Sequence, residues 1–447
     1  MRRYDIFTFF AAGILALSVT GCSIGVDDIF DRSAAERIND AVAEYSQVVS
    51  SSAGGWVMEY YPTNGLESPT GSGYLIMADI RPDGSVAMAM DNEITGGTLV
   101  ADTSMWNVIR DNGPVLSFST YNKCIHTFCD PAIYDTGLGF EGDYEFLIIN
   151  MEENAPQAML KGKKRGVYVR MSRVPEGTVF ADYLADVAHF QDSVMPVKAV
   201  NYNLLHIGDS LFRIENISSG IPNIYPYDGD AIADESLHPF LVTAHSDGYH
   251  LRFRSPIEKA GGQVQEFVYD ESQGAFLCPD KGDVKLTGPD PVTFFAESAV
   301  RHFWTCTLKS ASMSSDLFEK YNAINTDGGK LKDKYSVKSM QFSSFLKSDD
   351  AVSLSLDITF TTSKKKTATV SYVYDVVMSD GRMTLSAPQP KDNTAANVLS
   401  SIPSVTQFLE AVSDSYMIGG TVSNFCMNEL LLKSESGKFI TVKYSEK

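Results

Sequence analysis

The feature that most constrains the fold is a series of short runs in which apolar and polar residues alternate. From Trp56 onward such runs read WVMEYY, GYLIMADI, SVAMAMD, PVLSFST, YEFLIIN, QAMLKG and GVYVRMS. Turn signals separate them, as at Pro82-Asp83-Gly84 and Asn112-Gly113-Pro114. No helical pattern lies between these runs, and parallel strands need long crossovers. The sequence therefore predicts a mainly β fold of antiparallel modules, either curled barrels or sandwiches.

Two helical segments divide the chain into regions. Ser33 and Glu36 form a capping box that opens a predicted helix over 33–51, with an apolar stripe on one face. A second predicted helix, 178–192, lies between Pro175 and Pro196 and is typical of a connector. We therefore expect an N-terminal helix plus β domain over 33–176, a connecting helix over 177–196 and a β-rich region of one or two modules over 197–447. Two short helices are expected in that last region, near 315–324 and 404–413.

The N-terminus has the layout of an export signal. Arg2 and Arg3 precede a short apolar run that ends at Val19-Thr20-Gly21-Cys22. This segment resembles the bacterial lipobox, which implies a signal peptide over 1–21, lipidation at Cys22 and a tether over 22–32. No later stretch reaches the ~20 apolar residues that a membrane helix needs. We expect a lipid-anchored protein of the outer membrane, at the cell surface or on the periplasmic face.

Charge and cysteine content exclude several classes of partner and cofactor. The chain has 37 basic and 56 acidic residues, a net charge of −19, which disfavours binding to nucleic acid. Cys124, His126 and Cys129 offer soft metal ligands, but nearby sequence supplies no fourth ligand. We therefore expect no metal site. Because no P-loop or zinc-protease motif occurs, we expect no cofactor either.

Aromatic residues are frequent in the first β region. Trp56, Tyr60, Trp106 and Tyr121 are candidates for an exposed platform that binds a ligand such as a glycan. The competing interpretation places these rings in the core, since so many aromatic residues cannot all be exposed.

One segment invites a catalytic interpretation. Gly208-Asp209-Ser210-Leu211 matches the nucleophile block of GDSL esterases, and His250 follows Asp247 as a possible base. The surrounding sequence predicts strands, whereas those enzymes use a three-layer α/β fold. The alternative is a hairpin turn at Gly208-Asp209, and we expect no catalytic residues.

Several segments together resemble the Bacteroidota lipoproteins grouped as domain of unknown function 4302. They are residues 31–37, 55–62, 112–118, 121–123, 142–146 and 161–164, with His126, Phe128, Asp130 and Pro131. The resemblance implies an accessory lipoprotein encoded near outer-membrane transporters of the starch-utilisation type, and it implies no activity.

These observations favour a non-enzymatic accessory of a nutrient uptake system that binds a glycan, a peptide or a partner protein. Two alternatives stay open. One is a serine esterase that uses Ser210 and His250, and the other is a structural assembly subunit of an outer-membrane transporter complex.

Overall fold

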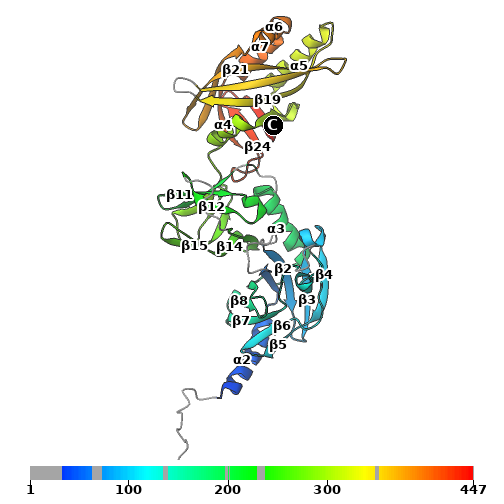
Figure 1. Cartoon of the computed structure of the whole chain (residues 1–447), viewed down its shortest axis with the longest axis vertical. Helices are drawn as coiled ribbons and strands as arrows, with labels where there is room; N and C mark the ends of the chain where they lie inside the picture. The colour runs from blue at the N-terminus through cyan, green and yellow to red at the C-terminus, as the bar shows by residue number, and fades with distance from the viewer. Residues whose placement is uncertain are drawn as a thin grey trace, which may run out of the picture.

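The computed structural model describes residues 33–62, 73–133, 139–196, 200, 202–228, 237–347 and 352–445. The predicted signal peptide, the predicted lipidation site Cys22 and the predicted tether lie outside these residues. The described part forms three β modules in a row, with helix α2 at one end and the C-terminal module at the other (Figure 1). Neighbouring strands in all three sheets pair antiparallel, for example β1 with β2, β10 with β11 and β20 with β21. The predicted mainly β, antiparallel fold is confirmed.

The first module is a nine-stranded sheet with the strand order β4-β3-β2-β1-β9-β8-β7-β6-β5. Its edge strands β4 and β5 are separated in sequence by Trp106 alone, so the sheet must curl strongly. The strands are β1 (Trp56–Tyr61), β2 (Tyr74–Ile80), β3 (Ser85–Met90), β4 (Val100–Met105), β5 (Asn107–Arg110), β6 (Pro114–Ser117), β7 (Glu145–Met151), β8 (Gln157–Gly162) and β9 (Tyr168–Arg173).

Helix α2 (Ala34–Val49) precedes this sheet and begins with the predicted capping box between Ser33 and Glu36. Val48 and Val49, at its C-terminal end, are buried against the sheet.

Helix α3 (Phe180–Val194) is the predicted connecting helix, and it leads into the middle module. This module is an eight-stranded sheet with the order β12-β11-β10-β17-β16-β15-β14-β13. Tyr183 of α3 protects the edge strand β13, because its hydroxyl accepts from the amide of Ala244 and donates to the carbonyl of the same residue. The strands are β10 (Asn203–Ile207), β11 (Ser210–Glu215), β12 (Asn223–Pro226), β13 (Phe240–His245), β14 (Gly248–Lys259), β15 (Gly262–Asp270), β16 (Ala275–Leu277) and β17 (Val284–Thr287).

The C-terminal module is a barrel, closed by pairing of its first strand with its last. Its strands are β18 (Phe303–Cys306), β19 (Ser336–Lys347), β20 (Val352–Thr361), β21 (Thr367–Ser379), β22 (Arg382–Pro390), β23 (Ser415–Gly420), β24 (Glu429–Ser434) and β25 (Phe439–Ser445). Its helices are α4 (Pro291–Arg301), α5 (Ser315–Lys330), α6 (Asn393–Ser401) and α7 (Ser404–Val412). The sequence predicted the sites of α5 and α7 but missed α4 and α6.

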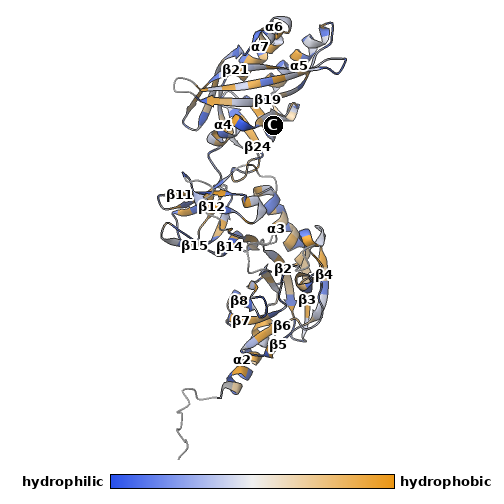
Figure 2. Ribbon diagram, in the orientation of Figure 1, coloured by the Kyte–Doolittle hydropathy of each residue, from blue (hydrophilic) through white to orange (hydrophobic). Residues whose placement is uncertain are grey.

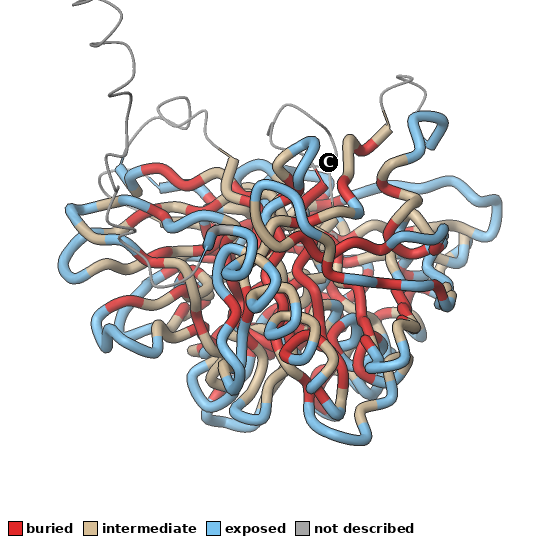
Figure 3. Tube along the Cα trace, turned by 90° about the horizontal axis from the view of Figure 1, so that it is seen from below, coloured by how far each residue is buried: buried red, intermediate tan, exposed pale blue. Residues whose placement is uncertain are grey.

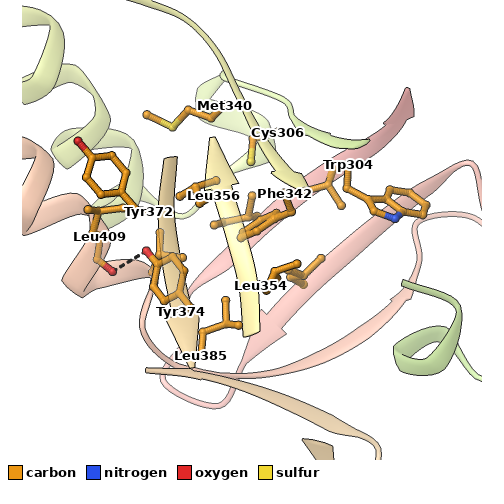
Figure 4. Packing of buried hydrophobic residues seen from close by; sticks show 14 of the residues in the cluster. Trp304, Cys306, Met340, Phe342, Leu354, Leu356, Tyr372, Tyr374, Leu385 and Leu409 are labelled. Atoms are coloured by element: carbon orange, nitrogen blue, oxygen red, sulfur yellow. Dashed lines mark hydrogen bonds between the residues drawn. The ribbon is translucent and has the colours of Figure 1, made fainter. Parts of the chain in front are cut away.

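The interior of the barrel is filled by side chains. Phe342, Leu356 and Tyr372 are cross-strand neighbours on β19, β20 and β21, and all are buried (Figure 4). The hydroxyl of Tyr374 donates to the carbonyl of Leu409 on α7 at 2.9 Å, which ties the helical cap to the barrel wall. The barrel interior is thus a packed core. Candidate ligand sites are therefore the surfaces of the modules and the joints between them.

Each module has apolar residues along its strands (Figure 2), and exposed residues concentrate in the turns at the periphery (Figure 3). The core of the middle module is continuous with its neighbours. It includes Val57 and Met77 from the first sheet, and Phe425 and Cys426 from the loop between β23 and β24. Among the described residues no helix has the length and apolar character to cross a membrane.

Candidate functional site

The predicted aromatic platform does not form as proposed, because three of its four members are core residues. Trp56, Tyr60 and Trp106 are buried, and the polar atom of each ring is hydrogen-bonded within the first module. Strand β1 is buried along its whole length, since the module core covers one face and α3 with the middle module covers the other. Tyr121 alone is exposed, at 66%.

Tyr121 belongs to a different aromatic group, which we call the Tyr121 stack: Tyr121, His126 and Tyr144. The His126 ring lies between the tyrosines, with centroid distances of 5.4 Å to Tyr121 and 4.6 Å to Tyr144. Tyr144 is 40% exposed. The stack therefore presents two tyrosine rings to solvent on the surface of the first module.

Ser210 and His250 are not brought together. Ser210 begins β11 and His250 lies on β14, and four strands separate β11 from β14 in the sheet. Both ring nitrogens of His250 are hydrogen-bonded to carboxylates, Nδ1 to Glu266 and Nε2 to Asp247, at 2.9 Å each. The ring therefore has no nitrogen left to activate Ser210. Gly208-Asp209 forms the expected hairpin turn, with Gly208 at φ +54°.

Glu266, one of the two carboxylate partners of His250, belongs to a charge cluster that connects the first module to the middle module; three members of the cluster are buried and Glu266 is partly exposed. Glu59 and Arg170 are cross-strand neighbours on β1 and β9, and Arg252 and Glu266 are cross-strand neighbours on β14 and β15. Arg170 contacts Glu59 at 3.0 Å and Glu266 at 3.5 Å, while Arg252 lies 3.6 Å from each carboxylate. Four alternating charges, two from each module, thus face one another. We call this contact the first joint.

Protonation equilibria at the first joint are strongly perturbed. Burial raises the pKa of Glu59 despite the neighbouring arginines. Burial opposes ionisation of Glu266 too, but the hydrogen bond from His250 and the charges of Arg170 and Arg252 lower its pKa to about 2. Burial disfavours protonation of His250, yet its hydrogen bonds to Glu266 and Asp247 raise its pKa. Because ionised carboxylates only accept hydrogen bonds, the form of His250 that satisfies both contacts is the doubly protonated ring.

The middle module and the barrel meet through a loop, in what we call the second joint. Phe425, from the β23–β24 loop, is buried in the core of the middle module, 5.0 Å from the ring of Phe276. The side-chain amide of Asn203 donates from Nδ2 to the carbonyl of Phe425 at 2.7 Å. Gly288 passes so close to this loop that a Cβ atom there would lie 1.7 Å from the carbonyl oxygen of Asn424. Where the β23–β24 loop enters the middle module, a cleft remains between the loop and helix α3.

A cleft of about 670 Å³ lies beside the second joint, and we call it the joint cleft. One wall is α3, a second is the middle module and the third is the barrel loop around Asn424. The ring of Tyr249 stacks on Phe190 at a centroid distance of 3.9 Å and an interplanar angle of 10°. Its hydroxyl donates to Asp186 at 2.8 Å, which fixes the ring in its plane. The ring of Tyr269 meets Phe190 edge-on at 5.1 Å.

Polar groups complete the joint cleft. The turn that carries Glu271, Ser272 and Gln273 is held by Asp270, whose carboxylate accepts from Ser272 Oγ at 2.6 Å and from Gln273 Nε2 at 2.9 Å. His189 and Asn424 face it from the other two walls. The described lining residues include one carboxylate, Glu271, and neither lysine nor arginine. Half-buried tyrosines with several neutral hydrogen-bonding groups are chemically suited to an uncharged polar ligand.

A larger hollow lies on the first module and has no tyrosine among its described lining residues. It measures about 810 Å³ between β2–β4 and the start of α3, and alanine and glycine make up much of its lining. Of its charged residues, Asp79 and Arg81 pair with each other at 2.7 Å, and Asp102 accepts from the backbone amide of Lys123. Another hollow, of about 550 Å³, lies on the second joint near Tyr202, where Arg213 covers the ring at 3.7 Å. We therefore take the joint cleft as the candidate site.

The cysteine pair near His126 does not resemble a metal centre. Burial raises the pKa of both Cys124 and Cys129 to about 12, which keeps the thiols protonated. Nδ1 of His126 accepts a hydrogen bond from the amide of Asn122 at 3.1 Å. Within the described residues no three histidine, cysteine or acidic side chains are grouped as a metal would need.

Sequence reasoning missed the cleft residues because they are far apart in the chain. Tyr249 and Tyr269 come from different strands of the middle module, and Asn424 lies about 150 residues beyond them. The only local signal was the Asp247-Gly248 turn, which places Tyr249 at the start of β14.

Comparison with known proteins identifies the family. No curated protein matches the chain. A crystal structure of a variant of transferrin binding protein B, a vaccine antigen from Haemophilus parasuis, aligns over 88% of this chain and 75% of its own at 8% identity; its TM-score of 0.13 supports no structural argument. The family model described as domain of unknown function (DUF4302) matches residues 26–271, more than half of the chain. The matched range includes both sides of the first joint. Because the match covers more than half of the chain, the chain belongs to the DUF4302 family.

Proposed function

We propose that this protein is an exported lipoprotein, anchored through Cys22, that binds a neutral oligosaccharide in the joint cleft as a non-enzymatic accessory of nutrient uptake. The observation that carries the proposal is the composition of the cleft. Tyr249 and Tyr269 offer aromatic surface, and Gln273, Asn424 and Ser272 offer neutral donors and acceptors. Because the described lining has neither lysine nor arginine, an anionic ligand would meet no permanent positive charge there.

A sugar suits this combination because its ring has apolar C–H faces and a rim of hydroxyl groups. Aromatic rings cover the apolar face, while side-chain amides and hydroxyls pair with the rim. A volume of about 670 Å³ lies within the range of small-molecule sites. The cleft is open at its outer edge, where Val422 is 76% exposed, so a longer chain could extend beyond it.

The proposed anchor places this site near a membrane. Two or more acyl chains on Cys22 would make the attachment stable, and Bacteroidota lipoproteins of this layout would lie in the outer membrane. Export and capture at that membrane support a role beside a transporter. Metabolic labelling with a fatty acid tests the anchor: we expect label in the intact chain and none in the variant Cys22→Ala.

Ligand binding is tested by calorimetric titration of the full chain with neutral oligosaccharides of five to seven sugar units, beside oligogalacturonate and a peptide mixture. Ser193→Trp places a bulky ring in the cleft. Ala185→Trp, on an exposed position of the same helix, is the matched control. We expect a neutral oligosaccharide to bind, with at least about tenfold weaker binding in Ser193→Trp and no change in Ala185→Trp.

Other results would contradict the proposal. Binding of the peptide mixture alone would indicate a peptide-binding accessory. Equal binding by both tryptophan variants would place the site outside the cleft. Absence of binding to every probe, with co-purification of a transporter from membranes, would favour an assembly subunit.

A further inference from the structure

The Tyr121 stack has the properties of a second ligand-binding surface, separate from the joint cleft. It lies wholly within the first module, whereas the cleft is formed by α3, the middle module and the barrel. The exposed fractions of Tyr121 and Tyr144, 66% and 40%, are high for aromatic residues. Exposed aromatic rings that are held in a fixed orientation commonly mark recognition surfaces.

The loop that carries Tyr121 and His126 is held rigidly. Asn122, which is fully buried, accepts from the amide of Cys124 at 2.9 Å and donates to Ser104 Oγ at 3.2 Å. The amide of Lys123 donates to the Asp102 carboxylate on β4 at 3.0 Å. The next residues form a short 3-10 helix, His126–Cys129, that places Phe128 in the core, 4.8 Å from the ring of Tyr60.

Tyr144 approaches the stack from a separate segment, directly before β7. Its carbonyl accepts a hydrogen bond from the amide of Phe118 at 3.1 Å, which fixes the backbone at this point. The His126 and Tyr144 rings are nearly parallel, with an interplanar angle of 24°. A ligand would therefore meet ordered rings and would lose little affinity to side-chain ordering.

The polar atoms of the stack are suited to hydroxyl groups. Because His126 Nδ1 accepts from the Asn122 amide, the neutral ring carries its proton on Nε2 and can donate from there. Burial lowers the pKa of His126, so the ring is neutral at neutral pH. Two tyrosine hydroxyls complete a set of uncharged groups around an apolar surface.

We infer that the Tyr121 stack is a second saccharide-binding site, which holds a sugar ring against the exposed face of Tyr121. The inference goes beyond the joint cleft and shares no residue with it. A docking surface for a partner protein would use similar rings, but the exposed apolar area here is confined to a small group whose neighbours Lys123 and Glu145 are polar. This favours a small, hydroxyl-rich ligand.

The test is retardation of the full chain in native gels that contain neutral polysaccharides, with one variant for each ring. We expect Tyr121→Ala and Tyr144→Ala each to weaken retardation by about five- to tenfold, and Tyr121→Trp to retain it, because ring area carries the contact. Ile149→Ala, which removes an exposed apolar side chain on β7, is the control and should change nothing.

The cleft variant Ser193→Trp keeps this test independent of the proposed function. Loss of retardation in the stack variants with retention in Ser193→Trp supports the stack even if the cleft binds nothing. Equal retardation of Tyr121→Ala and the unmodified chain overturns the inference. Loss of a co-purified membrane protein in Tyr121→Ala, with unchanged retardation, also overturns it and indicates a protein-docking surface.

Discussion

The two joints of this protein differ in the contacts that form them: charged side chains at the first joint and an inserted apolar loop at the second. At the first joint, two sheets face each other through four alternating charges, from the buried Glu59, Arg170 and Arg252 and the partly exposed Glu266. At the second joint, an irregular loop inserts Phe425 into the middle module and leaves a cleft beside it. Buried charges tolerate little displacement, because a separated ion loses its partner in a poorly solvated site. We therefore expect the first joint to be rigid and the second to be the place where a ligand can be accommodated.

The largest expected effect comes from breaking the first joint. Arg170→Met removes a guanidinium whose side chain is 1% exposed and leaves Glu59 buried without its main partner. We expect the free energy of unfolding to fall by about 3–5 kcal/mol in a denaturant titration. Lys163→Met removes an exposed ion pair with Asp111 and Glu145 and should lower the free energy of unfolding far less, because solvent screens exposed charges. Equal losses in the two variants would show that the buried cluster has no special role.

A smaller effect is expected from disturbing the second joint. Gly288→Ala would force the backbone at Asn424 to move, since the added Cβ would otherwise lie 1.7 Å from its carbonyl oxygen. We expect a loss of about 1–3 kcal/mol and a separate melting transition for the barrel in calorimetry. Gly282→Ala is the control, because no atom lies within 4 Å of the Cβ position there. A single transition with unchanged midpoint in Gly288→Ala would mean that the second joint adapts freely.

The first joint should also respond to pH through His250. Its pKa in the folded protein is raised above 6.5, so its ion pairs contribute stability that is fully present below pH 6.5 and is lost as pH rises through the folded value. The stability difference between the unmodified chain and His250→Gln should therefore shrink with rising pH. Both chains are compared with His245 replaced by Gln, because burial and the neighbouring His250 lower the pKa of His245 to about 4, which gives its contribution the opposite pH dependence. A difference that is constant from about pH 5 to about pH 9 would show that the His250 charge does not matter.

The smallest effect is expected at Ser210, which is exposed and lies outside both joints. Ser210→Ala should change the free energy of unfolding by less than about 0.5 kcal/mol and should leave any ester hydrolysis by the purified chain unaltered. Loss of measurable hydrolysis on this substitution would revive the esterase hypothesis.

Local patterns predicted local structure well. The capping box at Ser33 and Glu36, the hairpin turn at Gly208-Asp209 and helix α7 are all present. Helix α4 was missed although Asp290 and Pro291 supply a helix start, with Asp290 capping the amide of Thr293. The strand-like runs on either side of α4 favour a β prediction for this whole region, so its apolar residues do not stand out as a helix.

Tertiary burial could not be read from alternation. Trp56 and Tyr60 lie in the core of the first module and Val57 lies in the core of the middle module, as alternation along β1 requires, but alternation cannot reveal that both faces of this strand are covered. The covering elements, α3 and the middle module, lie more than 100 residues away in sequence. The joint cleft was unpredictable for the same reason, because its three walls meet only once the barrel loop has inserted.

Hydrogen–deuterium exchange of the full chain, with and without the neutral oligosaccharide that binds it best, tests whether the ligand binds in the joint cleft. We expect the ligand to protect the turn 269–274 and the barrel loop 420–424, with no change at β1 and β9 of the first joint. Protection confined to the first joint, or none in either segment of the joint cleft, would contradict the assignment of ligand binding to the second joint.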